Sequence, residues 1–225
     1  ESYTYEGLEQ GKKYNVKIIA VAKNNKTAEV IGEQETGKVV ELTTANAKFT
    51  YSPNTWTNGD VVATVTTDVT GFTIQTSKDG KTWEDKTSQT MSSNGPVYAR
   101  LWDGTNAGGM LTGNVTKIDK TPATISISAT ATGTSTGTLS AVVDDKESGL
   151  SQIKWEWGTN TNYGNSATDK YTSMNGTNAG TIGSTTKTKS LTGLSAGTTY
   201  YVRITAYDVA GISELAKIPS RDELL

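Results

Sequence analysis

Cysteine and histidine are both absent from this sequence of 225 residues. Without cysteine, the chain cannot form a disulfide, a thiolate nucleophile or a thiolate zinc site. Without histidine, it lacks the commonest general base and the commonest metal ligand at neutral pH. The two absences exclude Ser–His–Asp and Cys–His catalysis within the chain. Catalysis by carboxylates and the binding of calcium by oxygen ligands remain possible.

An excess of charge and long apolar runs are also missing. The 21 basic and 23 acidic residues give a net charge of −2, so the composition does not indicate a nucleic acid partner. The longest apolar run, Ile18–Ala22, is far shorter than the roughly 20 residues that a membrane-spanning helix needs. We therefore expect neither a nucleic acid partner nor a membrane span in this chain.

The sequence does contain a repeated phrase of thirteen residues. Leu8–Ala20 and Leu194–Ala206 both read L-x-x-G-x-x-Y-x-V-x-I-x-A, and a glycine precedes each leucine. A repeat at a fixed offset reflects the architecture of the chain. Half of the offset of 186 residues is 93, which is close to the roughly 100 residues of a sandwich of two β-sheets.

Short runs in which apolar and polar residues alternate, separated by Gly, Thr, Ser and Asn, predict strands throughout the chain. No stretch has apolar residues at a sustained helical period. The sequence therefore predicts an all-β protein. We place its domains at residues 1–44, 45–121 and 122–225, and a Pro-containing linker at Lys120–Pro122 separates the last two.

The first of these domains is too short for a complete sandwich. Aligned on the repeat, it contains only the last strands of one, predicted at Tyr14–Ala22 and Val39–Thr44. About forty residues rarely bury enough apolar surface to fold alone. We expect that the rest of this domain lies upstream in a longer polypeptide.

The repeated phrase also carries a family resemblance. It resembles the tyrosine corner of fibronectin type III domains, in which a tyrosine early in a strand bonds back to the preceding corner. The matching residues are Leu8, Gly11 and Tyr14 in the first copy and Leu194, Gly197 and Tyr200 in the second. Residues 45–121 are similar to the Ig-like repeats of bacterial surface proteins, on the segments Trp56–Val61, Ser77–Trp83, Val97–Arg100 and Asp119–Pro122.

The resemblance implies an elongated array of immunoglobulin-like and fibronectin type III-like β-sandwiches. Residues 1–44 would be the C-terminal part of a fibronectin type III-like module, 45–121 a bacterial Ig-like module, and 122–225 a fibronectin type III-like module with a C-terminal tail. Folds of this class host many unrelated functions, so the resemblance bears on architecture more than on activity.

Acidic residues gather in one predicted loop, which contains Asp144, Asp145 and Glu147. In a fibronectin type III-like sandwich this loop would lie at the same end as the one that carries Asp208. Several carboxylates at one tip could bind calcium through their oxygen atoms. The alternative is a solvated acidic turn, in which Asp and Gly serve the backbone geometry.

Aromatic residues form a second candidate site. Trp56, Trp83 and Trp102 could make a carbohydrate-binding platform, because flat aromatic faces stack on sugars. The alternative is packing in the core and at its rim, which is normal for aromatic residues in small sandwiches. A third candidate is a cross-link between Lys48, on a first strand, and Asn114, on a last strand, as found in some surface modules.

The sequence does not indicate an enzyme. Paired carboxylates for glycoside hydrolysis need a cleft and a buried acid, whereas the acidic clusters here fall in polar turns. Glu156 lies between Trp155 and Trp157, so it is expected on the solvent face of its strand if the tryptophans face the core.

These observations predict a non-catalytic structural or adhesive segment, a stalk or spacer with ligand-binding loops, in a large extracellular protein of a bacterial cell surface. Its partner would be a glycan or protein of a host or cell surface, and calcium is the one cofactor that the sequence suggests. Two alternatives remain open. One is an accessory carbohydrate-binding or spacer region of a secreted polysaccharide-degrading enzyme, and the other is a component of a phage tail or fibre.

Overall fold

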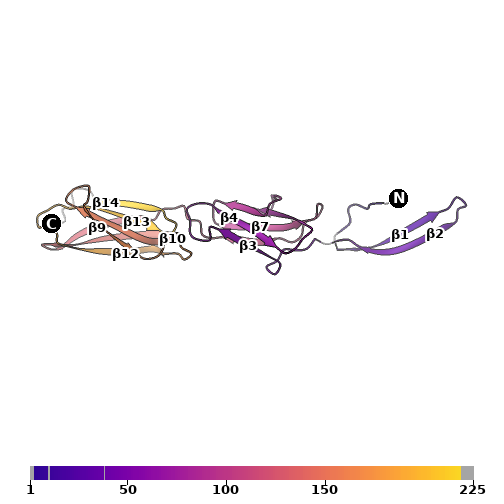
Figure 1. Cartoon of the computed structure of the whole chain (residues 1–225), viewed down its shortest axis with the longest axis horizontal. Helices are drawn as coiled ribbons and strands as arrows, with labels where there is room; N and C mark the ends of the chain where they lie inside the picture. Colours follow the sequence, from indigo (N-terminus) through magenta and orange to yellow (C-terminus); the bar gives the residue numbers. More distant parts are fainter. Residues whose placement is uncertain (1–2, 10, 38, 219–225) are drawn as a thin grey trace. The chain divides into compact units, whose positions relative to one another are not determined.

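The structure is a computed structural model that describes residues 3–9, 11–37 and 39–218. These residues form fourteen strands and no helix (Figure 1), which confirms the all-β prediction. The described part of the chain therefore has no helix of the length and apolar character that crossing a membrane requires. Gln10 of the repeated phrase and the tail expected at 219–225 lie outside the described residues.

The first two strands, β1 (Lys13–Val21) and β2 (Thr27–Glu35), pair as an antiparallel hairpin. Their apolar side chains are exposed: Ile18 is 64% exposed and Val30 is 66% exposed. No residue of either strand is buried. Two strands without a covered apolar face are at best marginally stable in water.

The prediction of a strand at Val39–Thr44 is wrong, because these residues form no strand in the structure. Val39 and Leu42 are buried in the core of the following sheets, and the backbone N–H of Leu42 donates to the carbonyl of Gly109 at 3.3 Å. The apolar pattern of this segment is thus satisfied by packing onto a sandwich rather than by a ladder of strand hydrogen bonds.

Two three-stranded sheets follow. One contains β3 (Ala47–Ser52), β4 (Val61–Thr67) and β6 (Ser88–Met91), and the other contains β5 (Thr73–Ser77), β7 (Gly95–Trp102) and β8 (Leu111–Val115). Strands of both sheets contribute to one core, whose buried residues are Val39, Leu42, Ala47, Val65, Ala99, Leu101 and Leu111. Two sheets that bury their apolar faces against each other form a sandwich.

The last six strands form a second sandwich. They are β9 (Thr124–Gly133), β10 (Thr136–Gly158), β11 (Asn165–Lys170), β12 (Thr181–Thr192), β13 (Tyr201–Asp208) and β14 (Ser213–Ile218). The first part of β10, up to Asp145, pairs with β9 and β12. Its second part, from Leu150, pairs mainly with β11 and β13, and β13 pairs with β14. The pairing register shifts between these two residues, where β10 passes from one layer to the other.

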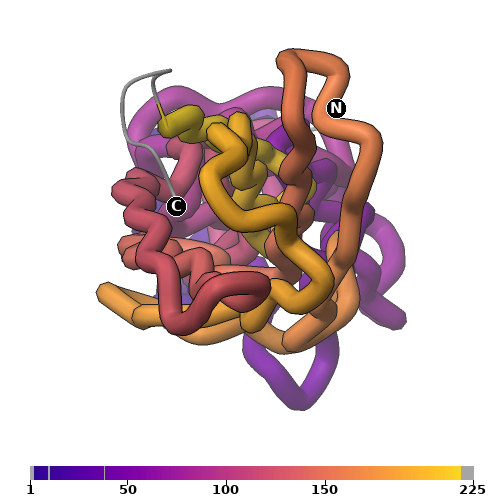
Figure 2. The backbone as a smooth tube through the Cα atoms, turned by 90° about the vertical axis from the view of Figure 1, so that its left-hand side faces the viewer, coloured from indigo at the N-terminus to yellow at the C-terminus, as the bar shows by residue number. Residues whose placement is uncertain are grey.

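Both layers of this sandwich bury their apolar faces in one core. Its centre includes Leu139, Val143, Ile153 and Ile204, together with Trp155, which is fully buried. The core confirms the sandwich fold expected for this part of the chain, and it distinguishes Trp155 from Trp157, which is only half-buried. Figure 2 shows the sandwich from one end, with the loops between its strands, coloured rose to yellow, toward the viewer.

The chain packs into two compact units, and each is described by itself. The second unit comprises Tyr51–Ala63, Thr90–Gly95 and the described residues from Asn114 onward. It therefore contains the β9–β14 sandwich and the segment that leads into it. All the residues of the carboxylate cluster described next belong to this unit.

Candidate metal centre

Three buried aspartates from distant parts of the sequence meet in the second unit. Asp119 follows β8, Asp145 lies in β10, and Asp208 ends β13. One carboxylate oxygen of each lies within 4.8 Å of the others. The three residues are 0%, 4% and 0% exposed, respectively.

Asp145 is held by the turn in which β10 changes layer. One carboxylate oxygen, Oδ1, accepts the backbone N–H groups of Glu147 at 2.9 Å and Gly149 at 2.8 Å. Gly149 has a φ of +81°, and a Cβ there would lie 2.8 Å from the backbone of Gly180. Only glycine fits both the left-handed backbone and the close approach.

Asp119 is bound to the same turn by Ser148. The backbone N–H of Ser148 donates to Asp119 Oδ2 at 3.0 Å, and the N–H of Thr121 donates to Oδ1 at 3.0 Å. Burial alone would raise the pKa of Asp119, but the hydrogen bonds from Ser148 and Thr121 outweigh it and lower this pKa below its ordinary value. Asp119 is therefore held in the charged form.

Asp208 closes the group from the other side. Its Oδ1 accepts the backbone N–H of Ile212 at 2.8 Å, within the turn between β13 and β14. Burial raises the pKa of Asp208 to about 7, and the charges of Asp119 and Asp145 act in the same direction, against the hydrogen bond from Ile212. A negative charge on Asp208 is thus unfavourable beside the other two carboxylates unless a cation compensates for it.

Two oxygen atoms in the group have no partner. Asp145 Oδ2 and Asp208 Oδ2 are buried and accept no hydrogen bond from any residue that the structure describes. Within the described residues, no lysine or arginine forms an ion pair with Asp119 or with either of these two. A buried carboxylate oxygen left without a partner is costly, and such charges are normally paired or bind a metal.

Glu147 lies at the exposed rim of the group. A hydrogen bond with Asp119 raises the pKa of Glu147, and burial and the charges of Asp119 and Asp145 raise it further. Beside it, a surface cavity of about 290 Å³ is lined by Thr121, Pro122, Thr124, Asp144, Asp145, Lys146 and Glu147. This cavity is therefore lined by Asp145 of the group and by Glu147 at its rim.

The structure brings Asp145 and Asp208 together, as the predicted calcium tip requires, and places Glu147 beside them. Asp144 lies outside the group and is paired with Thr124 and Ser184 in the strand ladders. The sequence prediction missed Asp119, which supplies the third buried carboxylate.

Hydrogen bonds also join the segments around this site within the second unit. The backbone N–H of Trp56 donates to the carbonyl of Gly176 at 2.9 Å, and Thr57 forms a parallel bridge with Ile118. The side chain of Asn94 bonds both the N–H and the carbonyl of Ile118, at 2.8 and 2.7 Å. The residue before Asp119 is therefore fixed on several sides.

The predicted aromatic platform is partly occupied by an arginine. The guanidinium carbon of Arg100 lies 4.1 Å from the ring centroid of Trp83 and 5.7 Å from that of Trp102. All three tryptophans of the predicted platform are half-buried, and Trp56 belongs to the second unit. Sugar binding stays a prediction, and a sugar on Trp83 would compete with Arg100 for the ring face.

The cross-link between Lys48 and Asn114 also stays a prediction. Both residues are exposed, and the backbone N–H of Asn114 bonds the hydroxyl of Tyr51 at 2.9 Å. A cross-link would show as the loss of one ammonia from the mass of the chain.

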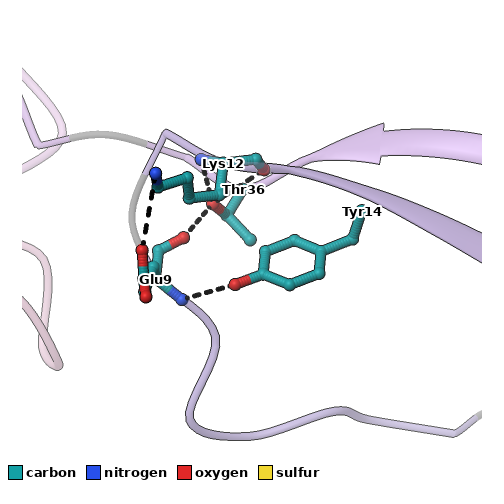
Figure 3. Close-up of polar contacts among 4 residues, drawn as sticks. All are labelled: Glu9, Lys12, Tyr14 and Thr36. Carbon is teal, nitrogen blue, oxygen red and sulfur yellow. Dashed lines mark hydrogen bonds and ion pairs between the residues drawn. The ribbon is translucent and has the colours of Figure 1, made fainter.

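The two copies of the repeated phrase make the same hydrogen bond. The hydroxyl of Tyr14 accepts the backbone N–H of Glu9 at 3.0 Å (Figure 3), and the hydroxyl of Tyr200 accepts that of Ser195 at 3.0 Å. In the first copy, the hydroxyl of Thr36 also donates to the carbonyl of Glu9. Each tyrosine thus ties its strand to the corner that precedes it.

Glu156 lies on the face of β10 that points away from the core, but it is not exposed to solvent as was expected from its two tryptophan neighbours. It is 7% exposed because Arg203 and Lys154 cover its carboxylate. Alternation along the strand does turn Glu156 away from Trp155 and the core, but long cationic side chains then bury it.

Comparison with known proteins gives no family assignment. No protein-family model matches the chain, and no curated protein matches it. Among solved structures, domains FN1–FN3 of chicken CNTN1 are similar to it, with 12% identity, a TM-score of 0.32, and coverage of 94% of this chain and 78% of that one. Domains A168–A170 of titin are also similar, with 12% identity, a TM-score of 0.44, and coverage of 93% and 75%. The fold assignment therefore rests on the strand order and cores described above.

Proposed function

We propose that this chain is a non-catalytic spacer segment of a large extracellular protein of a bacterial cell surface. The observation that carries the proposal is that the segment leading into the last sandwich is hydrogen-bonded to it. Asp119 is bonded to Ser148, and Trp56 is bonded to Gly176. A spacer needs segments between sandwiches that resist bending and pulling. A free linker would leave these backbone groups to water instead of bonding them to the sandwich.

The bacterial surface location is supported by the resemblance of residues 45–121 to bacterial Ig-like repeats. Adhesion to a surface glycan or protein is a further part of the proposal, supported by the half-buried Trp83 and Trp102. A glycan array tests that part directly. Binding that Trp83→Ala abolishes would support adhesion, whereas a blank array would leave the spacer role alone.

Single-molecule pulling tests the spacer role. With handles before Ala45 and after Ile218, we expect discrete force peaks, because the strand ladders of a sandwich break together. Unfolding of the β9–β14 sandwich, Thr124–Ile218, would release roughly 300 Å of chain. Smooth extension of the chain without force peaks would contradict the spacer role.

A further inference from the structure

We infer that Asp119, Asp145 and Asp208 bind one divalent cation of the calcium type and that this cation clamps the segment before the linker onto the β9–β14 sandwich. The inference depends on the geometry of the second unit and not on the spacer role. It differs from the calcium tip that the sequence predicted, because it includes Asp119 and leaves out Asp144.

The first argument is convergence from three separate segments. Three buried aspartates offer oxygen atoms within 4.8 Å of one another. At this separation three like charges repel strongly in a medium from which water is excluded. An arrangement of this kind needs either a proton or a compensating cation, and no described lysine or arginine pairs with these carboxylates.

The second argument is the pair of partnerless oxygens. In both Asp145 and Asp208, Oδ1 is anchored by backbone N–H groups, whereas Oδ2 is buried and accepts no hydrogen bond from the described part of the chain. Backbone anchoring of one oxygen fixes the direction of the other. Two oriented buried oxygens in a group of three carboxylates are what a metal ion requires of its ligands.

The chemistry of the ligand atoms indicates which metal ion the site would bind. All the ligands are carboxylate oxygens, and the chain has no histidine or cysteine, so the site suits a hard cation rather than zinc or copper. Calcium takes six to eight oxygen ligands in flexible geometry, whereas magnesium demands a near-ideal octahedron and retains water. Glu147 at the rim and water from the adjoining cavity can complete a calcium shell.

The position of Asp119 determines what a bound cation would do to the structure. Asp119 directly precedes the linker Lys120–Pro122, whereas Asp145 and Asp208 belong to the sandwich that follows it. A cation held by all three would add bonds between this segment and the sandwich to the hydrogen bonds of Ser148. Calcium should therefore stabilise the second unit and protect the linker from proteases.

The test is calcium titration of the whole chain, by calorimetry and by thermal melting in calcium or in chelator. We expect one calcium ion per chain with a Kd of about 10⁻⁵ to 10⁻³ M. Saturation should raise the melting temperature of the β9–β14 sandwich by at least about 5 °C. Magnesium at the same concentration should have a smaller effect.

Asp145→Asn and Asp208→Asn are the informative variants. Asparagine retains the Oδ1 acceptor for the backbone N–H groups and replaces only the partnerless oxygen, so the turn should be preserved. Each variant should weaken calcium binding at least tenfold. In chelator, each should melt no lower than the unsubstituted chain, because one of three crowded charges is gone.

Asp144→Asn is the matched control, since it removes a neighbouring charge outside the group. It should change the Kd by less than about twofold, because a half-exposed charge is largely screened. An absence of calcium binding up to about 10 mM, well above the range of extracellular sites, would overturn the inference. Equal weakening by Asp144→Asn and Asp208→Asn would overturn it as well, because general surface charge would then explain the binding.

Discussion

Arg203 of β13 holds the carboxylate of Glu156, its ladder partner on β10, through two hydrogen bonds. Arg203 Nε donates to Oε2 at 2.6 Å and Nη2 donates to Oε1 at 2.7 Å. Lys154 adds an ion pair at 2.9 Å. The hydrogen bonds from Arg203, against the opposing effect of burial, lower the pKa of Glu156 to about 2, and Lys154 contributes in the same direction. A pair of hydrogen bonds in this geometry is stronger than a single surface ion pair.

Glu156→Gln should lower stability in a pH-dependent way. Because the folded pKa lies below the ordinary value of 4.5, the stabilisation is fully present above about pH 4.5 and is lost as the pH falls toward 2. At pH 7 we expect the variant to lose roughly 1–3 kcal/mol of unfolding free energy. Urea unfolding followed by tryptophan fluorescence measures this difference, which should shrink by more than half at pH 3. A difference that is constant with pH would show that the ion pair is not its cause.

The repeated phrase allows a matched comparison of two isoleucines. Ile204 is fully buried in the core of the last sandwich, whereas Ile18, at the same place in the first copy, is 64% exposed. Ile204→Ala should cost roughly 2–5 kcal/mol because it leaves a cavity. Ile18→Ala should stay within about 0.5 kcal/mol. Hydrogen exchange gives a second measure: amides of β1 should exchange much faster than those of β13. Equal protection of the two strands would mean that the first hairpin is covered.

Alanine substitutions at two glycines distinguish the cost of a left-handed backbone from the cost of a steric clash. Gly149 and Gly183 have similar φ values of +81° and +83°, but a Cβ meets backbone 2.8 Å away only at Gly149. Gly183→Ala should therefore cost only about 1–2 kcal/mol for the left-handed backbone. Gly149→Ala should cost about 2–5 kcal/mol, because the turn that holds Asp145 must also move. Melting temperatures of the two variants measure the difference, and equal losses would contradict the close approach to Gly180.

Local sequence patterns predicted the strands well wherever every second side chain of a strand faces a single core. The run from Tyr200 to Ala206 is an example, since its inward residues are those that the alternation selects. Val39–Thr44 shows the limit of the method. Its apolar residues suit a strand as well as an irregular segment packed on a sandwich, and only tertiary contacts decide between the two.

The candidate site could be predicted only in part. Asp145 and Asp208 were found because the resemblance places their loops at one end of a sandwich. Asp144 was included with them, although neighbouring residues of a strand point to opposite faces. Asp119 was noticed only as part of the segment Asp119–Pro122 that carries the family resemblance. No local pattern linked it to the acidic loops, because it lies between β8 and β9, outside both loops. A contact between segments that are distant in sequence leaves no periodic pattern.

The central claim is that a cation joins Asp119 to Asp145 and Asp208. A crystal structure of the chain grown in calcium tests it most directly. We predict one calcium ion with oxygen atoms of all three carboxylates about 2.3–2.6 Å away, including Asp145 Oδ2 and Asp208 Oδ2. Three carboxylates around a water molecule, or with a proton shared between two of them and no ion, would contradict the claim.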